Sequence, residues 1–174
     1  MGIQFETDYN METLTAMAKG LRKTVRKKRS RRVHIFAAVV LILGLLTILA
    51  TTAGGEPLGA SGVVTLLAML VVILVSLFED RLNAWFAKKR LLPGTEHAAA
   101  TFEEDGYVSA TSMSESKFSY AQIVAVAETA RYFVFALSSH HTQAYDKRTI
   151  RGGSVEDFRA FIAEKTGKPV EKIK

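Results

Sequence analysis

The sequence predicts an α+β fold in which two apolar helices interrupt a domain built from an antiparallel β-sheet and a closing helix. Two apolar runs, Val33–Ala53 and Gly62–Phe78, are separated by eight residues. From His97 onward, short segments of alternating polarity replace them. An amphipathic stretch follows Ser154 near the end of the chain. These patterns predict a helical hairpin, a sheet and a final helix, in that order.

Both apolar runs are long enough to cross a lipid bilayer. The first contains one ionisable side chain, His34, and the second contains none. A hydrocarbon core about 30 Å thick needs roughly 20 helical residues, with about 17 as the lower limit. Because backbone groups in lipid must be hydrogen-bonded within their own segment, residues 33–53 and 62–78 are predicted to be transmembrane helices. The alternative is that both runs are buried helices of a soluble core. This would require a small domain to enclose two long apolar helices.

The basic residues predict the orientation of this hairpin. Nine Lys and Arg residues lie between residues 19 and 32 without an acid, so the rest of the chain carries a net charge of −3. Four more follow the second run, whereas the loop Gly54–Ser61 has none. Since Lys and Arg are enriched on cytoplasmic flanks, both termini are predicted to be cytoplasmic. The depth of the basic block within the chain and the second run argue against a cleaved signal peptide.

The segment before the hairpin is predicted to form a strand and then a helix. Ile3–Glu6 alternates apolar and polar residues, as a short strand does. Thr7 or Asp8 is expected to cap the helix, which continues into the first span. One interpretation is that its basic side contacts anionic lipid headgroups. The other is that its apolar face packs on the C-terminal domain, and the two interpretations are compatible. The apolar face consists of Met11, Leu14, Ala18, Leu21 and Val25.

After the second run, a short helix and then a meander of strands are predicted. The helix begins at Glu79–Asp80, carries Leu82, Trp85 and Phe86 on one side, and ends before Pro93. Strands joined by short turns imply antiparallel pairing, and the fifth, most apolar strand is expected to be central. The six predicted strands are His97–Glu103, Tyr107–Thr111, Ser116–Tyr120, Ile123–Glu128, Arg131–Ser138 and Thr142–Lys147.

A well-marked amphipathic helix is predicted after the strands. Ser154 and Asp157 have the spacing of a capping box, and Gly167 is a plausible stop. Its apolar residues, from Val155 to Ile162, are expected to cover the open end of a curled sheet. The predicted fold is therefore a pleckstrin-homology-like antiparallel β-barrel capped by a C-terminal helix.

One set of residues spans the predicted strands and the final helix: Glu104–Gly106, Phe118–Ile123, Val126–Thr129, Tyr132–Phe133, Lys147–Arg148, Phe158, Phe161 and Ile162. Together with the order of the elements, these residues resemble the YcxB-like family of bacterial membrane proteins. The resemblance implies a pleckstrin-homology-like fold in which the N-terminal strand completes the sheet, so that the transmembrane hairpin is an insertion. It also implies a multi-pass protein of the bacterial inner membrane. The family often has Pro before its Lys-Arg pair, where this chain has Asp146.

Four regions of the chain follow from these predictions. They are a strand and basic helix at 1–32, the transmembrane hairpin at 33–78, a juxtamembrane helix at 79–93, and a cytoplasmic pleckstrin-homology-like domain at 95–174.

No catalytic, metal or cofactor site is predicted. The chain has no Cys, which excludes thiolate ligands and a cysteine nucleophile. His140–His141 matches no metal-ligand spacing, and Ser138–Ser139 has no nucleophile-elbow motif around it. Gly152–Gly153 precedes a helix without the remainder of a phosphate-binding motif. An enzyme is therefore not expected.

Two classes of function remain. The first is a non-enzymatic membrane protein whose cytoplasmic domain binds a protein partner, or a second copy of itself, at the anionic inner leaflet. The alternative is an anionic-lipid-sensing or regulatory module. Nucleic acid is not an expected partner, because the positive charge is confined to one block beside a membrane helix. The candidate lipid contacts are Arg22, Lys23, Arg26, Lys27, Lys28, Arg29, Arg31, Arg32, Lys88, Lys89, Arg90, Lys147, Arg148 and Arg151.

Overall fold

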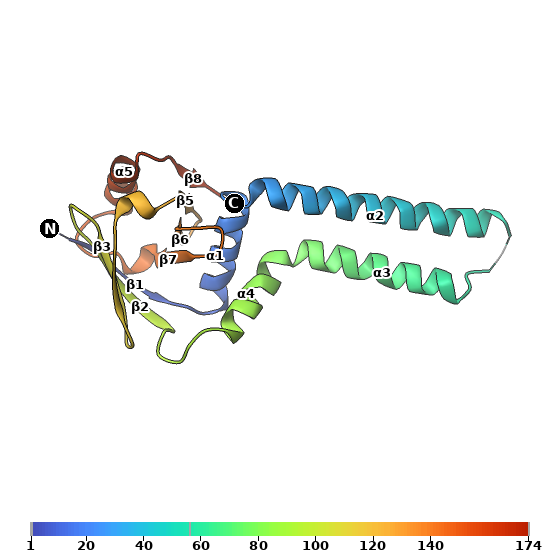
Figure 1. Cartoon of the computed structure of the whole chain (residues 1–174), viewed down its shortest axis with the longest axis horizontal. Helices are drawn as coiled ribbons and strands as arrows, with labels where there is room; N and C mark the ends of the chain where they lie inside the picture. The colour runs from blue at the N-terminus through green and yellow to red at the C-terminus, as the bar shows by residue number, and fades with distance from the viewer. Residues whose placement is uncertain (1, 56, 174) are drawn as a thin grey trace.

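The computed structural model describes residues 2–55 and 57–173. Three residues lie outside this part: Glu56, which belongs to the loop predicted between the two spans, and the terminal residues Met1 and Lys174 of the first and last predicted regions. A β-rich domain occupies one end of the molecule, and two long helices project from it side by side (Figure 1). The α+β class predicted from the sequence is confirmed.

The first of two sheets joins the N-terminal strand to the segment that follows the hairpin. Its order is β1-β2-β3-β4, and every pairing in it is antiparallel. The predicted strand at Ile3–Glu6 is confirmed, and it extends by two residues. The strands are β1 (Ile3–Asp8), β2 (His97–Phe102), β3 (Tyr107–Thr111) and β4 (Glu115–Phe118).

The second sheet has the order β7-β6-β5-β8, with β6 between two antiparallel neighbours as predicted for the most apolar strand. Its edge strand β8 pairs in parallel with β5 and was not predicted, because it is only three residues long and directly follows Pro169. The strands are β5 (Ala125–Glu128), β6 (Tyr132–Ala136), β7 (Thr142–Asp146) and β8 (Val170–Lys172).

Within the described residues, the two sheets do not close into the predicted barrel. The edge strands β1 and β7 adjoin but form no ladder: the Asp146 N–H donates a 3.1 Å hydrogen bond to Thr7 Oγ1, and the isolated bridge from Gln4 runs to Arg151, beyond the end of β7. On the other side, the edge strands β4 and β8 share no ladder either. The domain is therefore a pair of packed sheets.

Two helices and a hairpin are inserted between adjacent strands of the first sheet. β1 and β2 pair over their full length, from Ile3 opposite Phe102 to Asp8 opposite His97. Both ends of the insertion are therefore tied to the same β-ladder. Its helices are α1 (Met11–Lys23), α2 (Lys27–Ala53), α3 (Ala60–Leu77) and α4 (Glu79–Lys89).

The start and end of α1 differ from the prediction. Thr7 and Asp8 still belong to β1, and Asn10 caps the helix by accepting the N–H groups of Glu12 and Thr13 at 2.9 and 3.0 Å. The helix also does not run on into the first apolar helix, because a turn at residues 24–26 separates α1 from α2. This turn lets α1 cross the end of the hairpin instead of extending it (Figure 1).

The main core lies between the two sheets, where α5 (Val155–Thr166) covers one end. Phe5 of β1 is 1% exposed and contacts the ring of Phe158 of α5 at a centroid distance of 4.6 Å. The predicted capping box of Ser154 and Asp157 is confirmed, as is the stop at Gly167, whose φ of 62° is left-handed.

A smaller core lies on the other face of the second sheet, under α1. There Ala16 and Met17 of α1 pack on Tyr132 and Val134 of β6. A Cβ at Gly20 would lie 2.7 Å from the Val134 side chain, so only glycine allows this close approach. Because both faces of β6 are covered, all five of its residues are buried, which explains its unbroken apolar sequence.

The helices α2 and α3 have no buried residue and are long and apolar enough to cross a membrane. They pack against each other near Gly44, where a Cβ would lie 2.8 Å from Met69 Sδ. Their remaining apolar side chains, such as Phe36 at 70% exposure, cover the outside of the hairpin. Such a surface is unfavourable in water and suits a lipid environment.

Candidate functional site

The base of the hairpin is held to the β-domain by an ion pair between α1 and α4. Arg22 donates two hydrogen bonds to the Asp80 carboxylate, at 2.7 and 2.6 Å, and a second acid, Glu79, lies 3.8 Å away. The hydrogen bonds to Asp80 raise the pKa of Arg22. Ala84 of α4 is fully buried beside this pair of helices. α1 therefore connects the sheet on one side with the hairpin on the other.

A groove of about 500 Å³ opens beside this ion pair, where α1, α2, α4 and the β6–β7 loop meet. Most of its apolar lining comes from α1 and includes Leu14 and Leu21, which are both buried. Its charged lining contains one acid, Glu79, and four arginines. The polar and charged lining residues are Arg22, Arg26, Arg29, Ser30, Glu79, Asn83, Arg90, His140 and Thr142.

The four arginines of this groove are not equivalent. Arg22 is neutralised by Asp80, as described above. Arg26 donates from Nε to the backbone oxygen of Ser139 at 2.7 Å, which holds its guanidinium over the groove without cancelling its charge. Arg29 and Arg90 are exposed and have no acidic partner within the described residues. The groove thus keeps an excess of positive charge.

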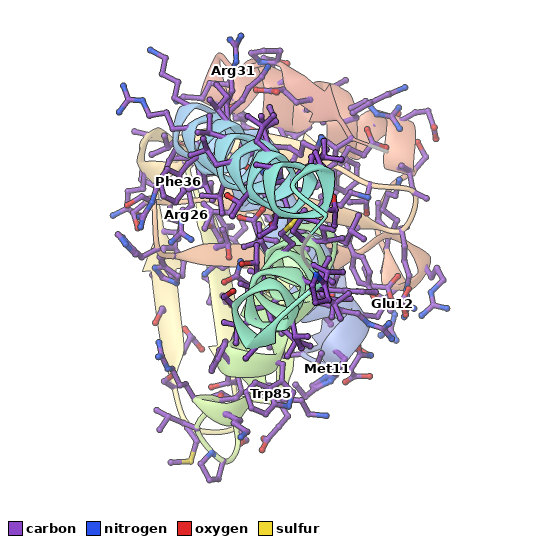
Figure 2. All side chains as sticks on the ribbon, turned by 90° about the vertical axis from the view of Figure 1, so that its right-hand side faces the viewer. Met11, Glu12, Arg26, Arg31, Phe36 and Trp85 are labelled. Atoms are coloured by element: carbon purple, nitrogen blue, oxygen red, sulfur yellow. The ribbon has the colours of Figure 1, made fainter. Side chains whose placement is uncertain are left out.

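The other predicted lipid contacts near the hairpin lie outside this groove. Figure 2 looks along the hairpin from its tip and places Arg26 at one side of the gap between α2 and α3. Arg31, which belongs to α2, lies on the side of α2 that faces away from α3. The Lys89 ammonium lies 3.7 Å from the ring centre of Trp85, which is labelled in Figure 2. The remaining members of this set are Lys23 at the end of α1, Lys27, Lys28 and Arg32 on the first turns of α2, and Lys88 on α4.

The three predicted contacts at 147, 148 and 151 do not form one site with the groove. Lys147 donates to Glu128 Oε1 at 3.0 Å and to the Thr129 backbone oxygen at 2.7 Å, and its side chain is 13% exposed. Arg148 and Arg151 are about two-thirds exposed and pair with Asp146 and Glu6 respectively. Of these three residues, Lys147 therefore interacts with groups of the protein itself.

The Glu128 cluster is a buried ionic cluster that the sequence did not indicate. The Glu128 side chain is 5% exposed and receives two hydrogen bonds from Arg159, at 2.7 and 2.8 Å, in addition to that from Lys147. The hydrogen bonds from Arg159, followed by the one from Lys147, lower the pKa of Glu128 to about 2. Its three members come from β5, α5 and the turn after β7, so no local motif connects them.

Asp146, which stands where the family often has Pro, has a structural role. It accepts two hydrogen bonds from Arg131, at 2.9 and 2.8 Å, and the N–H of Arg148 at 3.0 Å. The latter caps the short helix η2 (Lys147–Thr149). The carboxylate ends the strand by hydrogen bonding, where Pro would end it through its fixed φ.

His97 and Gly152 have structural surroundings that explain their presence. His97 pairs with Asp8 at 2.8 Å, away from His140, and no group of three His, Asp or Glu side chains suited to a metal occurs in the described part of the chain. Gly152 has a φ of 82°, and a Cβ there would lie 2.6 Å from the Gly2 backbone oxygen. This glycine is required by a tight turn against the N-terminus.

These features define a class of protein: an α+β domain of two packed sheets that carries an inserted pair of long apolar helices. The family model described as YcxB-like protein matches residues 102–162, from the end of β2 to the last buried residue of α5. The predicted resemblance is confirmed over this stretch. No curated protein and no solved structure matches the chain.

Proposed function

We propose that this chain is a non-enzymatic protein of the bacterial inner membrane that presents a pleckstrin-homology-like domain to a protein partner at the cytoplasmic face. The hairpin of α2 and α3 spans the bilayer, and both termini are cytoplasmic. The length and composition of the two helices and the thirteen basic residues on their domain-side flanks support this arrangement.

One observation carries the proposal: the apolar hairpin is an insertion within the sheet, not a tail attached to it. β1 and β2 are adjacent strands, yet they enclose all four helices. The Arg22–Asp80 ion pair closes this insertion at its base. Because both ends of the hairpin are attached to the β-domain, the domain keeps a constant distance from the bilayer and a constant orientation. Such a fixed position suits a domain on which a partner protein assembles.

The edge strand β4 is the surface that we propose for the partner. Among the described strands it pairs only with β3, and the side chains of Glu115, Ser116 and Lys117 are exposed. An unpaired edge can accept an added strand from another chain. Strand addition would lengthen the first sheet at the side that faces away from β1.

A photo-crosslinking amino acid at Lys117, in the full-length protein in intact cells, tests this proposal. We expect a discrete crosslinked protein that is absent when the same group replaces Glu156 on α5, which is also exposed. The proposal fails if Lys117 gives no discrete product, or if both positions give the same products.

A second candidate function, sensing of anionic lipid, is supported by the groove at the hairpin base. Its arginines lie where α2 and α4 meet the domain, which is the level of the headgroups in the proposed orientation. The cluster at Lys147, Arg148 and Arg151 supports this function less, because Lys147 is held by Glu128.

A further inference from the structure

The groove between α1, α2 and α4 has the composition of an anionic phospholipid site. Its lining combines apolar side chains, most of them from α1, with Arg26, Arg29 and Arg90. Its volume of about 500 Å³ falls in the range of small-ligand sites, roughly 300–1,000 Å³. An amphipathic ligand with a negatively charged head matches both the apolar and the basic part of this lining.

The position of the groove favours a ligand that comes from the bilayer. Val33, the first residue of the apolar run of α2, lines it, and so does Phe86 of α4. Both side chains are about half exposed. The groove therefore extends from the arginines to the beginning of the hydrocarbon-facing surface, in the direction in which the acyl chains of a bound lipid would continue.

The charges of the groove favour a phosphate. Guanidinium groups bind phosphate oxygens through paired hydrogen bonds, and Arg is less strongly hydrated than Lys. Arg26 is held in place by its hydrogen bond to Ser139, so less side-chain freedom is lost when a ligand binds. Glu79 is the opposing charge, and it is already engaged by Arg22 and His34, each at 3.8 Å.

We propose that this groove binds the phosphate headgroup of an anionic glycerophospholipid, with Arg26, Arg29 and Arg90 as its ligands and the apolar side chains of α1 against the glycerol and first acyl carbons. The inference rests on the second candidate function and on the proposed membrane orientation. It assigns the lipid contact to three of the basic residues near the hairpin and not to the others.

The test is binding of short-chain, water-soluble lipids to the full-length protein in a neutral detergent, measured by native mass spectrometry. The groove variant carries R26Q, R29Q and R90Q. The matched control carries R31Q, R32Q and K88Q, which removes the same charge from the same region without touching the groove. We expect the affinity for phosphatidylglycerol to fall at least about tenfold in the groove variant and less than about twofold in the control.

Two further ligands distinguish the source of the phosphate. Phosphatidylcholine should bind the wild-type protein more weakly than phosphatidylglycerol, and inorganic phosphate should bind too weakly to compete. Equal losses in both variants would mean diffuse attraction, and competition by inorganic phosphate at equal concentration would mean a free-anion site. Either result overturns the proposal, as does a groove variant that binds like wild type.

The single variant R29Q keeps the test valid if the triple variant does not fold, because Arg29 is exposed and bonds to no other described side chain. We expect about a threefold loss for it, and an unchanged affinity would count against the site. Since binding is measured in detergent, it does not depend on topology. A wrong orientation in the cell would defeat the proposed function while leaving this result intact.

Discussion

Two clusters of basic residues in this molecule differ in what surrounds them. At Glu128, Lys147 and Arg159 converge on one buried carboxylate. At the base of the hairpin, Arg26, Arg29 and Arg90 line a groove without acidic partners in the described structure. A paired cation stabilises the fold, whereas an unpaired cation in a groove is available to a ligand. Basic composition alone does not separate these two roles.

The largest effect is expected from breaking the Glu128 cluster. Glu128→Gln leaves Arg159 and Lys147 without their shared carboxylate, which should lower the free energy of unfolding by about 3 kcal/mol. Thermal unfolding in detergent, followed by the near-ultraviolet circular dichroism of the core tyrosines, measures this change. Glu171→Gln on the exposed strand β8 is the control and should change stability little. Equal effects of the two substitutions would contradict a special role for Glu128.

The same cluster predicts how stability depends on pH. The pKa of Glu128 is lowered to about 2 in the folded protein, below its ordinary value of 4.5. Its contribution is therefore complete above about pH 4.5 and is lost as the pH falls toward 2. The difference in Tm between wild type and Glu128→Gln should shrink between pH 5 and about 3. A constant difference over this range would show that the carboxylate is not the source of the stabilisation.

Local patterns in the sequence were sufficient for much of the fold. The apolar hairpin, the strand at Ile3–Glu6 and the cap at Ser154 each depend on residues close together in the chain. The burial of β6 was also predictable, because its apolar run is uninterrupted. The start of α1 was not predictable in this way, because Thr7, Asp8 and Asn10 are all suitable N-cap residues. The pairing of β1 with β2 places Thr7 and Asp8 in the strand and leaves Asn10 as the cap.

The features that were not predicted depend on residues far apart in the chain. Whether the sheets close into a barrel depends on the pairing of their edge strands, β1 with β7 and β4 with β8, to which no local motif refers. The groove exists because the turn at residues 24–26 lets α1 cross α4, so that Arg26 and Arg90 line the same surface. Its arginines were among the candidates, but their separation from Arg31 and Lys88 required the structure.

An intermediate effect is expected at the ion pair beside the groove. Asp80→Asn frees Arg22, which lines the groove, and so converts a paired cation into an unpaired one. Stability should fall by about 2 kcal/mol, while the affinity for short-chain phosphatidylglycerol should rise up to about fivefold. Asp105→Asn, an exposed turn residue with the same change of charge, is the control. A rise in affinity that is equal in both variants would point to net charge and not to the groove.

The smallest effect on folding is expected from the basic block itself, although its effect on orientation should be large. Replacing the six basic residues between Arg26 and Arg32 by Gln removes exposed or half-buried charges, and stability should change by about 1 kcal/mol or less. Reporter fusions at residue 59 and at both termini would then show a fraction of molecules with inverted topology, because the positive charge on that flank sets the orientation. If the termini stay cytoplasmic in the wild-type proportion, the block does not direct insertion. Its charges would then act only through the lipid contacts at the base of the hairpin.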